Sequence, residues 1–234
     1  MRRVVEPELL DALPPDDPRA VGSRGDLRRL NFVMGHAHIL TRALAPGHGA
    51  SPLRSRPLRL VELGAGDGSL LLQLARRWSV HGITAEVTLL DRHTLVSGET
   101  RRAFAALGWS VETVASDVFA WLSSPVPVAG VMVANLFLHH FEEEGLGELL
   151  RLAAAKADLF IACEPRRSAF ALAAARSVGL LGCNDVTQHD AVVSVRAGFA
   201  GRELSAFWPQ TGEWELRERS AGLFSHCLLA QRNG

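Results

Sequence analysis

The stretch Val61-Glu62-Leu63-Gly64-Ala65-Gly66-Asp67-Gly68-Ser69-Leu70 decides the fold of this chain of 234 residues. The mainly apolar residues 58–61 are a run short enough for a buried strand, and the leucine-rich residues 70–75 continue as a helix. The three glycines therefore lie in a turn between a strand and a helix, where glycine allows positive φ angles and lets a ligand approach the backbone. The free N–H groups at the start of the helix add hydrogen-bond donors.

The spacing of these glycines differs from that of a dinucleotide-binding loop, in which the third glycine follows the second by three positions. Here the spacing is Gly64-x-Gly66-x-Gly68, and carboxylates stand at Glu62 and Asp67. Two carboxylates disfavour a pyrophosphate and suit a ligand that carries an amine or another cation. An ordinary tight turn is the alternative, so the interpretation depends on the downstream sequence.

Strand-like and helical segments alternate after the glycine loop. Their lengths and order predict a parallel sheet with helices on both faces. Near the end of the chain, two strand-like segments are only three residues apart, so they can pair only as an antiparallel hairpin. The predicted strands are residues 84–90, 109–114, 128–134, 159–163, 213–219 and 223–230, and the predicted helices between them are residues 94–107 and 142–157.

An acidic-x-Gly-x-Gly-x-Gly loop after a first strand, in a parallel sheet completed by one reversed strand, resembles the class I S-adenosylmethionine-dependent methyltransferases. The resemblance covers about residues 58–231 and implies their Rossmann-like α/β fold, a seven-stranded and mostly parallel doubly wound sheet with one antiparallel strand. It also implies S-adenosylmethionine as the cofactor and S-adenosylhomocysteine as the product. The stretch Leu138-His139-His140-Phe141 and the segment 188–199 are similar to small-molecule methyltransferases of quinone biosynthesis and polyketide tailoring.

Two regions stand outside the core of this fold. Residues 1–57 are predicted to form an N-terminal arm and a helical cap, because a proline-rich start precedes apolar residues that recur at helical spacing over residues 27–44. A loop is expected over residues 46–57. Residues 165–207 are longer than a plain crossover needs, so we expect an inserted lid within a methyltransferase domain of residues 58–234.

Ligands of open α/β sheets bind at the carboxyl ends of strands. Four polar residues lie at such predicted ends: Glu62, Asp91, Asp117 and Asn135. A carboxylate at Asp91 can accept both hydroxyls of a ribose. The resemblance implies that Asp117 accepts from the amino group of adenine, and for both residues a helix N-cap is the alternative. The candidate cofactor-binding residues are Glu62, Gly64, Ala65, Gly66, Gly68, Asp91, Arg92, Asp117, Val118, Asn135 and Leu136.

The proposed chemistry calls for alignment of the acceptor and removal of its proton, because a sulfonium methyl group is already activated. The chain has no tyrosine, so a general base must be His, Asp, Glu, Lys or Cys. A phenol is mostly neutral at pH 7 and an imidazole could take its proton, so the catalytic candidates are His139 and His189. The alternatives are that His140 packs on the sheet and that Arg166, Arg167 and Arg196 anchor loops through carboxylates. His36 and His38 are expected to be surface or capping residues. The candidate substrate-binding residues are His140, Glu164, Arg166, Asp190 and Arg196, of which Glu164 or Asp190 could orient the base.

Composition narrows the class of protein. Twenty-five basic residues balance twenty-five acidic ones, so no net positive field attracts nucleic acid or an anionic membrane. The three scattered cysteines fit a reducing compartment, and no apolar run suits a signal peptide or a membrane span, so a cytoplasmic protein is expected. No metal is expected, because no further ligand cluster with metal spacing accompanies the adjacent His139 and His140.

The leading hypothesis is a methyltransferase of secondary metabolism that acts on a hydroxyl of a small phenolic, quinone-like or polyketide acceptor. Methylation of carbon or nitrogen, and a non-catalytic subunit that binds the cofactor and stabilises a partner, are the alternatives. A nucleic-acid base methyltransferase is disfavoured, because Asn135 is followed by Leu136 and Phe137 instead of two prolines and an aromatic residue. The resemblance leaves a homodimer open.

Overall fold

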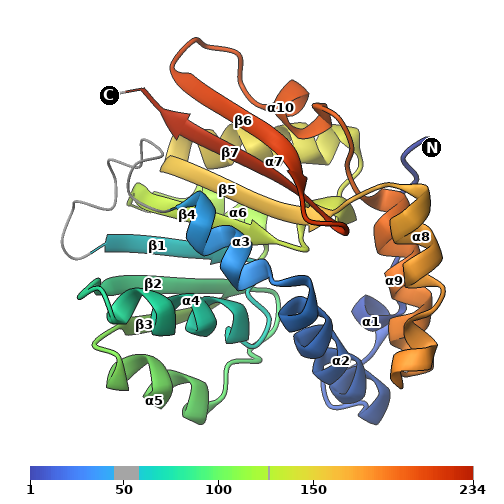
Figure 1. Ribbon diagram of the computed structural model, residues 1–234. Helices are drawn as coiled ribbons and strands as arrows, with labels where there is room; N and C mark the ends of the chain where they lie inside the picture. Colours follow the sequence, from blue (N-terminus) through green and yellow to red (C-terminus); the bar gives the residue numbers. More distant parts are fainter. Residues whose placement is uncertain (45–57, 126, 234) are drawn as a thin grey trace.

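The computed structural model describes residues 1–44, 58–125 and 127–233 (Figure 1). Within them, seven strands form one sheet in the order β3-β2-β1-β4-β5-β7-β6. Neighbouring strands are parallel except β7, which is antiparallel to both β5 and β6, so the predicted doubly wound sheet with one reversed strand is confirmed. The strands are β1 (Leu58–Leu63), β2 (Ala85–Asp91), β3 (Ser110–Ala115), β4 (Ala129–Asn135), β5 (Ala157–Pro165), β6 (Trp214–Ala221) and β7 (Ser225–Arg232).

Helices cover both faces of the sheet, and the sheet separates the core into two clusters. Successive side chains of a strand point to opposite faces, so Val131 and Val133 of β4 join one cluster while Met132 and Ala134 join the other. With both faces covered, β4 can be apolar throughout. The first cluster is completed by α3 (His36–Ala43), α4 (Ser69–Ser79) and α5 (Gly98–Ala106), and the second by α6 (Val118–Ser123), α7 (Glu143–Lys156) and α10 (Glu203–Phe207).

A separate group of helices stands beside the sheet, at the right of Figure 1. It combines the N-terminal region with the predicted lid, and α9 contacts α1, α2 and α8. Asp26 of α2 joins the two parts: its carboxylate accepts from the backbone N–H of Asn184 at 2.8 Å and from the hydroxyl of Thr187 at 3.1 Å. The members are α1 (Leu9–Ala12), α2 (Pro18–Met34), α8 (Ala169–Ala175), the 3₁₀ helix η3 (Val178–Leu181) and α9 (Asp185–Ala197).

Several boundaries differ from the sequence prediction. The single helix expected over residues 27–44 is two helices, because Gly35 adopts φ +70° and ends α2 before α3 begins. The helix expected from residue 94 starts at Gly98, where the Ser97 hydroxyl caps the backbone N–H of Thr100. The loop expected over residues 46–57 lies outside the described residues, and the domain boundary there stays a prediction. The helices that the structure describes include none that is both long and apolar enough to cross a bilayer.

Candidate active site

A cavity of about 1020 Å³ lies between the carboxyl ends of the parallel strands and the helices of the N-terminal region and the lid. Its walls include the glycine loop after β1, the ends of β2 and β4, and residues of α1, α2, α8 and α9. Binding sites for small molecules commonly measure roughly 300–1,000 Å³. The cavity is therefore large enough to hold a nucleoside cofactor together with a small acceptor.

The three glycines of the loop all have left-handed φ angles, from +54° to +73°, but their surroundings differ. A Cβ at Gly64 would come within 2.3 Å of the Phe137 ring, and one at Gly68 within 2.8 Å of a Leu89 methyl group. A Cβ at Gly66 would meet nothing within 4 Å. Gly64, Ala65 and Gly66 line the cavity as predicted, whereas Gly68 does not and is explained by packing against β2 at the start of α4.

Asp91 lines the cavity at the end of β2 and holds the glycine loop in place. Its Oδ2 accepts from the backbone N–H of Gly66 at 2.8 Å, and its Oδ1 accepts from the N–H of His93 at 2.9 Å. An ionised carboxylate has about four lone-pair sites, so each oxygen keeps capacity for a further donor. The position suits the predicted contact with ribose hydroxyls and ties that contact to the shape of the loop.

Two buried oxygen atoms on the same side of the cavity lack a hydrogen-bond partner among the described residues. They are Oε2 of Glu62 and Oδ1 of Asn135, and both residues line the cavity. Burial raises the pKa of Glu62 well above its ordinary value, and the nearby charges of Asp67 and Asp91 raise it further. Buried polar atoms are rarely left unpaired. An ammonium group or another donor from a ligand would satisfy the Glu62 oxygen, whereas the side chain of Asn135 also interacts with the imidazole of His36.

Asp117 caps a helix, which is the alternative to the predicted contact with adenine. Its Oδ1 caps α6 by accepting from the backbone N–H groups of Phe119 and Ala120, at 2.9 and 3.2 Å, and its Oδ2 lies 3.4 Å from Arg92. Asp117 is not among the residues that line the cavity, although Val118 and Arg92 are. The predicted adenine contact stays a prediction: Oδ1 is used to cap α6, while Oδ2 is partly exposed beside the lining residues Arg92 and Val118.

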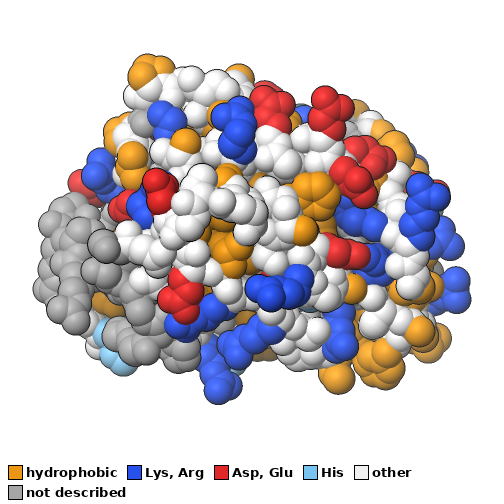
Figure 2. All heavy atoms as spheres, turned by 90° about the horizontal axis from the view of Figure 1, so that it is seen from above, with side chains coloured by type: hydrophobic (Ala, Val, Ile, Leu, Met, Phe, Trp, Pro, Cys, Tyr) orange, Lys and Arg blue, Asp and Glu red, His pale blue; other side chains and the backbone are white. Residues whose placement is uncertain are grey.

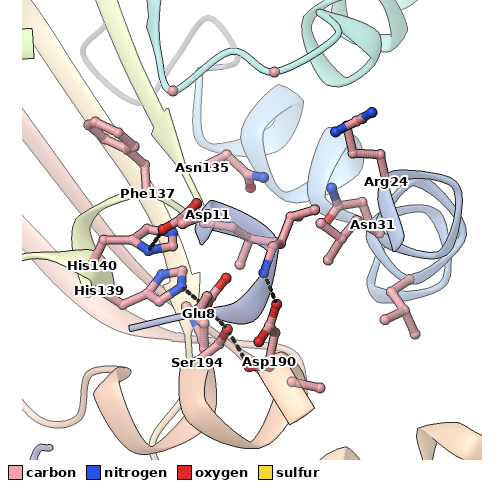
Figure 3. A pocket seen from close by; sticks show the side chains of 18 of the residues that line it. Glu8, Asp11, Arg24, Asn31, Asn135, Phe137, His139, His140, Asp190 and Ser194 are labelled. Atoms are coloured by element: carbon pink, nitrogen blue, oxygen red, sulfur yellow. Dashed lines mark hydrogen bonds and ion pairs between the residues drawn. The ribbon is translucent and has the colours of Figure 1, made fainter. Parts of the chain in front are cut away.

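The segment after β4 carries the polar end of the cavity. Leu136, a predicted cofactor residue that lines the cavity, has φ +51° and is the non-glycine residue with positive φ in the described part of the chain. Such strain is typical of functional sites. The 3₁₀ helix η2 (Leu138–His140) follows and places both histidines against the N-terminal arm (Figure 3).

His139 is buried between two carboxylates. Its Nδ1 lies 2.8 Å from Oε2 of Glu164 and its Nε2 lies 3.2 Å from Oε1 of Glu8. Burial lowers the pKa of His139, but the hydrogen bonds to both carboxylates outweigh burial and raise it to about 9. The imidazole is therefore a cation at neutral pH in this arrangement. It can act as the predicted base only after Glu8 has left Nε2.

Glu164 is buried next to the cavity and does not line it. It is fully buried, is absent from the lining, and accepts from the backbone N–H groups of Phe137 and Leu138 at 3.0 and 2.9 Å. The predicted contact of Glu164 with substrate is wrong in this structure, because its carboxylate is occupied in holding η2. The alternative prediction, that Glu164 orients a histidine base, agrees with the observed bond to His139.

The other acceptor-side predictions divide into residues that line the cavity and residues that do not. His140 and Asp190 line the cavity, whereas His189, Arg166 and Arg196 do not. His189 is about half exposed and its Nδ1 pairs with Asp190 at 2.9 Å. Arg196 pairs with Glu6 at 3.7 Å, and the buried Arg167 pairs with Glu203, which confirms for these two arginines that they anchor segments through carboxylates.

The prediction missed the contribution of the N-terminal arm and α2. Glu8, Asp11, Arg24 and Asn31 line the cavity, and Ser194 of α9 donates to Glu8 (Figure 3). No local motif marks these positions, since Glu8 is 131 positions from its partner His139. His36, expected to be a surface or capping residue, is buried, lines the cavity and lies 3.0 Å from the hydroxyl of Ser225, and burial lowers its pKa to about 4.

Comparison with known proteins agrees with this geometry. The family described as a methyltransferase domain matches residues 60–178. An O-methyltransferase family protein from Burkholderia thailandensis has a similar structure, with a TM-score of 0.59 and 18% identity over 95% of this chain and 64% of that one. The mitomycin 7-O-methyltransferase MmcR has a TM-score of 0.61 and 18% identity, and the match covers 96% of this chain and 60% of MmcR. The plantazolicin methyltransferase BamL was solved with S-adenosylhomocysteine (SAH) and a triazolic desmethylPZN analog. It has a TM-score of 0.64 and 10% identity, and the match covers 96% of this chain and 93% of BamL.

The chain thus spans less than two thirds of the Burkholderia protein and of MmcR. At these identities the solved structures show a common fold. No curated protein matches the sequence. Since the family match covers just over half of the 234 residues, and the sheet has the strand order and single reversed strand described above, the chain belongs to the methyltransferase-domain family and has the class I methyltransferase fold.

Proposed function

We propose that this protein transfers the methyl group of S-adenosylmethionine to a hydroxyl of a small, largely apolar acceptor of phenolic, quinone-like or polyketide type. The observation that carries the proposal is the division of one cavity into two ends. The glycine loop, Asp91 and the unpartnered oxygens of Glu62 and Asn135 form one end, and the polar cluster around His139 forms the other.

The first end fits the proposed cofactor. The buried oxygen of Glu62 and the spare acceptor sites of Asp91 would take an ammonium group and ribose hydroxyls, and the open space over Gly66 would admit the ligand close to the backbone. Val118 and Leu136 would flank its apolar parts. S-adenosylmethionine, when bound, supplies an activated methyl group, so the protein's remaining tasks are to align the acceptor and to handle its proton.

The space between α2 and the lid fits an apolar acceptor. It is lined mainly by alkyl side chains from both elements, so binding would be driven by burial of apolar surface. The lining residues from α2 and the lid that support this interpretation are Leu27, Leu30, Met34, Ala171, Ala174, Val178 and Val195. A hydroxyl on such a molecule would be directed to the polar groups at η2.

His139 is retained in the proposal and His189 is not, because His189 does not line the cavity. The 2.8 Å contact between Nδ1 of His139 and Glu164 supports a role for Glu164 in orienting the ring, and the hydroxyl would have to approach Nε2 on the side where Glu8 lies. Methylation of oxygen is supported further by two structural neighbours, an O-methyltransferase family protein and a mitomycin 7-O-methyltransferase. Figure 2 shows both signs of charge across the face that it displays, in keeping with a small acceptor instead of a polyanion.

The experiment is a turnover assay with labelled S-adenosylmethionine against matched acceptors. Each phenolic or quinol acceptor is compared with its O-methylated form and with an analogue in which hydrogen replaces the hydroxyl. We expect label transfer only to the free hydroxyl, and a loss of at least tenfold in kcat/KM for Asp91→Asn. Cofactor binding without transfer to any acceptor would favour a non-catalytic subunit, and label on carbon or nitrogen would contradict O-methylation.

A further inference from the structure

Glu8, His139 and His140 form a cluster at the acceptor end of the cavity. One ligand atom from each residue lies within 4.8 Å of those from the other two, and within the described ranges of the chain this is the one such group of three. Glu8 and His139 are buried, and the two imidazole rings lie 4.3 Å apart between centroids and are tilted by 31°. The cluster therefore joins the N-terminal arm to η2 through three side chains that are common ligands of metal ions.

The spacing between Glu8 and His139 fits a small divalent ion. Zinc binds histidine nitrogen and carboxylate oxygen at about 2.0–2.2 Å, so two ligands of a tetrahedral site lie about 3.4 Å apart. Nε2 of His139 and Oε1 of Glu8 are 3.2 Å apart. An ion could thus take the place of the proton between Nε2 and Oε1, which would be released to solvent, with little movement of either side chain.

The groups behind the cluster also match a metal site. Histidine ligands commonly donate their second ring nitrogen to a carboxylate, which fixes the ring and the nitrogen that faces the metal. Here Nδ1 of His139 is held by Glu164 at 2.8 Å, and Nδ1 of His140 lies 3.4 Å from Oδ2 of Asp11. Ser194 donates to Glu8 and limits its rotation. Each member of the cluster therefore has a supporting partner.

We propose that Glu8, His139 and His140 bind a divalent transition-metal ion, with zinc as the best match to two imidazoles and one carboxylate. All three residues line the cavity, so the fourth coordination position would be open to a cavity ligand. The sequence predicted no metal, because it shows only the two adjacent histidines and gives no sign that Glu8 joins them.

The proposal has two consequences for the molecule. A hydroxyl bound at the open position would have a lowered pKa, so the acceptor could be activated while Glu8 stays in place. The ion would also hold α1 against η2, because Glu8 is the residue that precedes α1. Metal binding should therefore stabilise the N-terminal arm as well as the cavity.

The test is a titration of chelator-treated protein with Co²⁺ and with Zn²⁺, without cofactor or acceptor, so that its failure is separate from failure of the methyltransferase proposal. We expect one equivalent of Co²⁺ with the visible absorption of a tetrahedral nitrogen and oxygen site, displaced by Zn²⁺. Glu8→Gln and His140→Asn should each weaken binding at least tenfold. Glu8→Asp should keep part of the affinity, and His81→Asn, which changes an exposed histidine outside the cavity lining, should keep all of it.

A second measurement guards against misfolded variants. Zn²⁺ should slow proteolysis within residues 1–17 of the wild-type protein and not of Glu8→Gln, with circular dichroism confirming the fold of each variant. Absence of one-equivalent binding by the wild type would overturn the proposal, as would equal affinity in Glu8→Gln. Intense near-ultraviolet absorption from thiolate ligation would also overturn it, since it would place the ion at the buried cysteines.

Discussion

The two ends of the cavity differ in how their polar groups are satisfied. At the cofactor end, buried oxygens of Glu62 and Asn135 have no hydrogen-bond partner among the described residues. At the acceptor end, the carboxylates of Glu8 and Asp190 are hydrogen-bonded, and both ring nitrogens of His139 have partners. The cofactor end is thus preformed for a ligand that brings its own donors. The acceptor end is closed by the protein's N-terminal arm.

The largest expected effect separates two glycines of the cofactor end. Gly64→Ala should lower the free energy of unfolding by about 2–5 kcal/mol, because the left-handed φ disfavours alanine and the new Cβ would meet the Phe137 ring. Gly66→Ala should cost only about 1–2 kcal/mol, since only its φ is unfavourable, but it should weaken cofactor binding at least tenfold. Urea unfolding and calorimetry measure the two quantities. Equal destabilisation by both substitutions would show that the Phe137 contact is unimportant.

The next effect concerns the support of the acceptor end. Glu164→Gln should destabilise the protein by about 3 kcal/mol, because it removes a buried charge that accepts from backbone N–H groups of η2 and from His139. Glu148→Gln changes an exposed carboxylate of α7 and is the control, with an expected change within about 0.5 kcal/mol. If thermal unfolding of the two variants is the same, η2 does not depend on Glu164.

A smaller and more local effect is expected at Asp190. Its carboxylate accepts from the backbone N–H groups of Leu9 and Leu10 at 2.8 and 2.9 Å and so holds the start of α1. Asp190→Asn should weaken this attachment by about 1–2 kcal/mol. Proteolysis within residues 1–17 should become faster while global unfolding changes little. Asp185→Asn, an exposed change on the same helix α9, should leave the cleavage rate near that of the wild type.

The smallest effect is a pH dependence at Glu62. The folded-state pKa of Glu62 is raised by burial and by Asp67 and Asp91, so folding favours its protonated form. Its contribution to stability is therefore full below the unfolded pKa of about 4.5 and is lost as pH rises toward the folded value. Glu62→Gln, which stays neutral, should show a shallower loss of stability between pH 5 and 8 in the ligand-free protein. An unchanged loss would mean that the folded-state pKa of Glu62 is not raised and that Glu62 is already ionised in the folded state over this range.

The same contrast explains what could be predicted from the sequence. The cofactor end follows local rules: a strand, a glycine turn and a helix adjoin in the chain, and Asp91 ends the neighbouring strand in a parallel sheet. Asp117 follows the same rule, but a carboxylate after a strand can equally cap the next helix, and capping is the role that the structure shows. At these positions one residue type serves two physical roles, and only the direction of the side chain separates them.

The acceptor end could not be predicted in this way, because its parts meet only through tertiary packing. Glu8 reaches His139 across 131 positions, and neither residue has a local signal that names its partner. His189 was predicted from the stretch Gln188-His189-Asp190. On α9, however, Asp190 faces the cavity and His189 is half exposed outside its lining. Adjacent residues of a helix point in different directions, so a short motif on α9 did not identify which side chain faces the ligand.

Calorimetric titration with S-adenosylhomocysteine is the most direct test that the glycine loop, Glu62 and Asp91 form a nucleoside site. We expect one site per chain for the wild type and an affinity at least tenfold weaker for both Asp91→Asn and Glu62→Gln. Asp158→Asn, an exposed change on β5, should bind as the wild type does. Absence of binding by folded wild-type protein, or unchanged affinity in both site variants, would contradict the assignment of this end of the cavity to the cofactor.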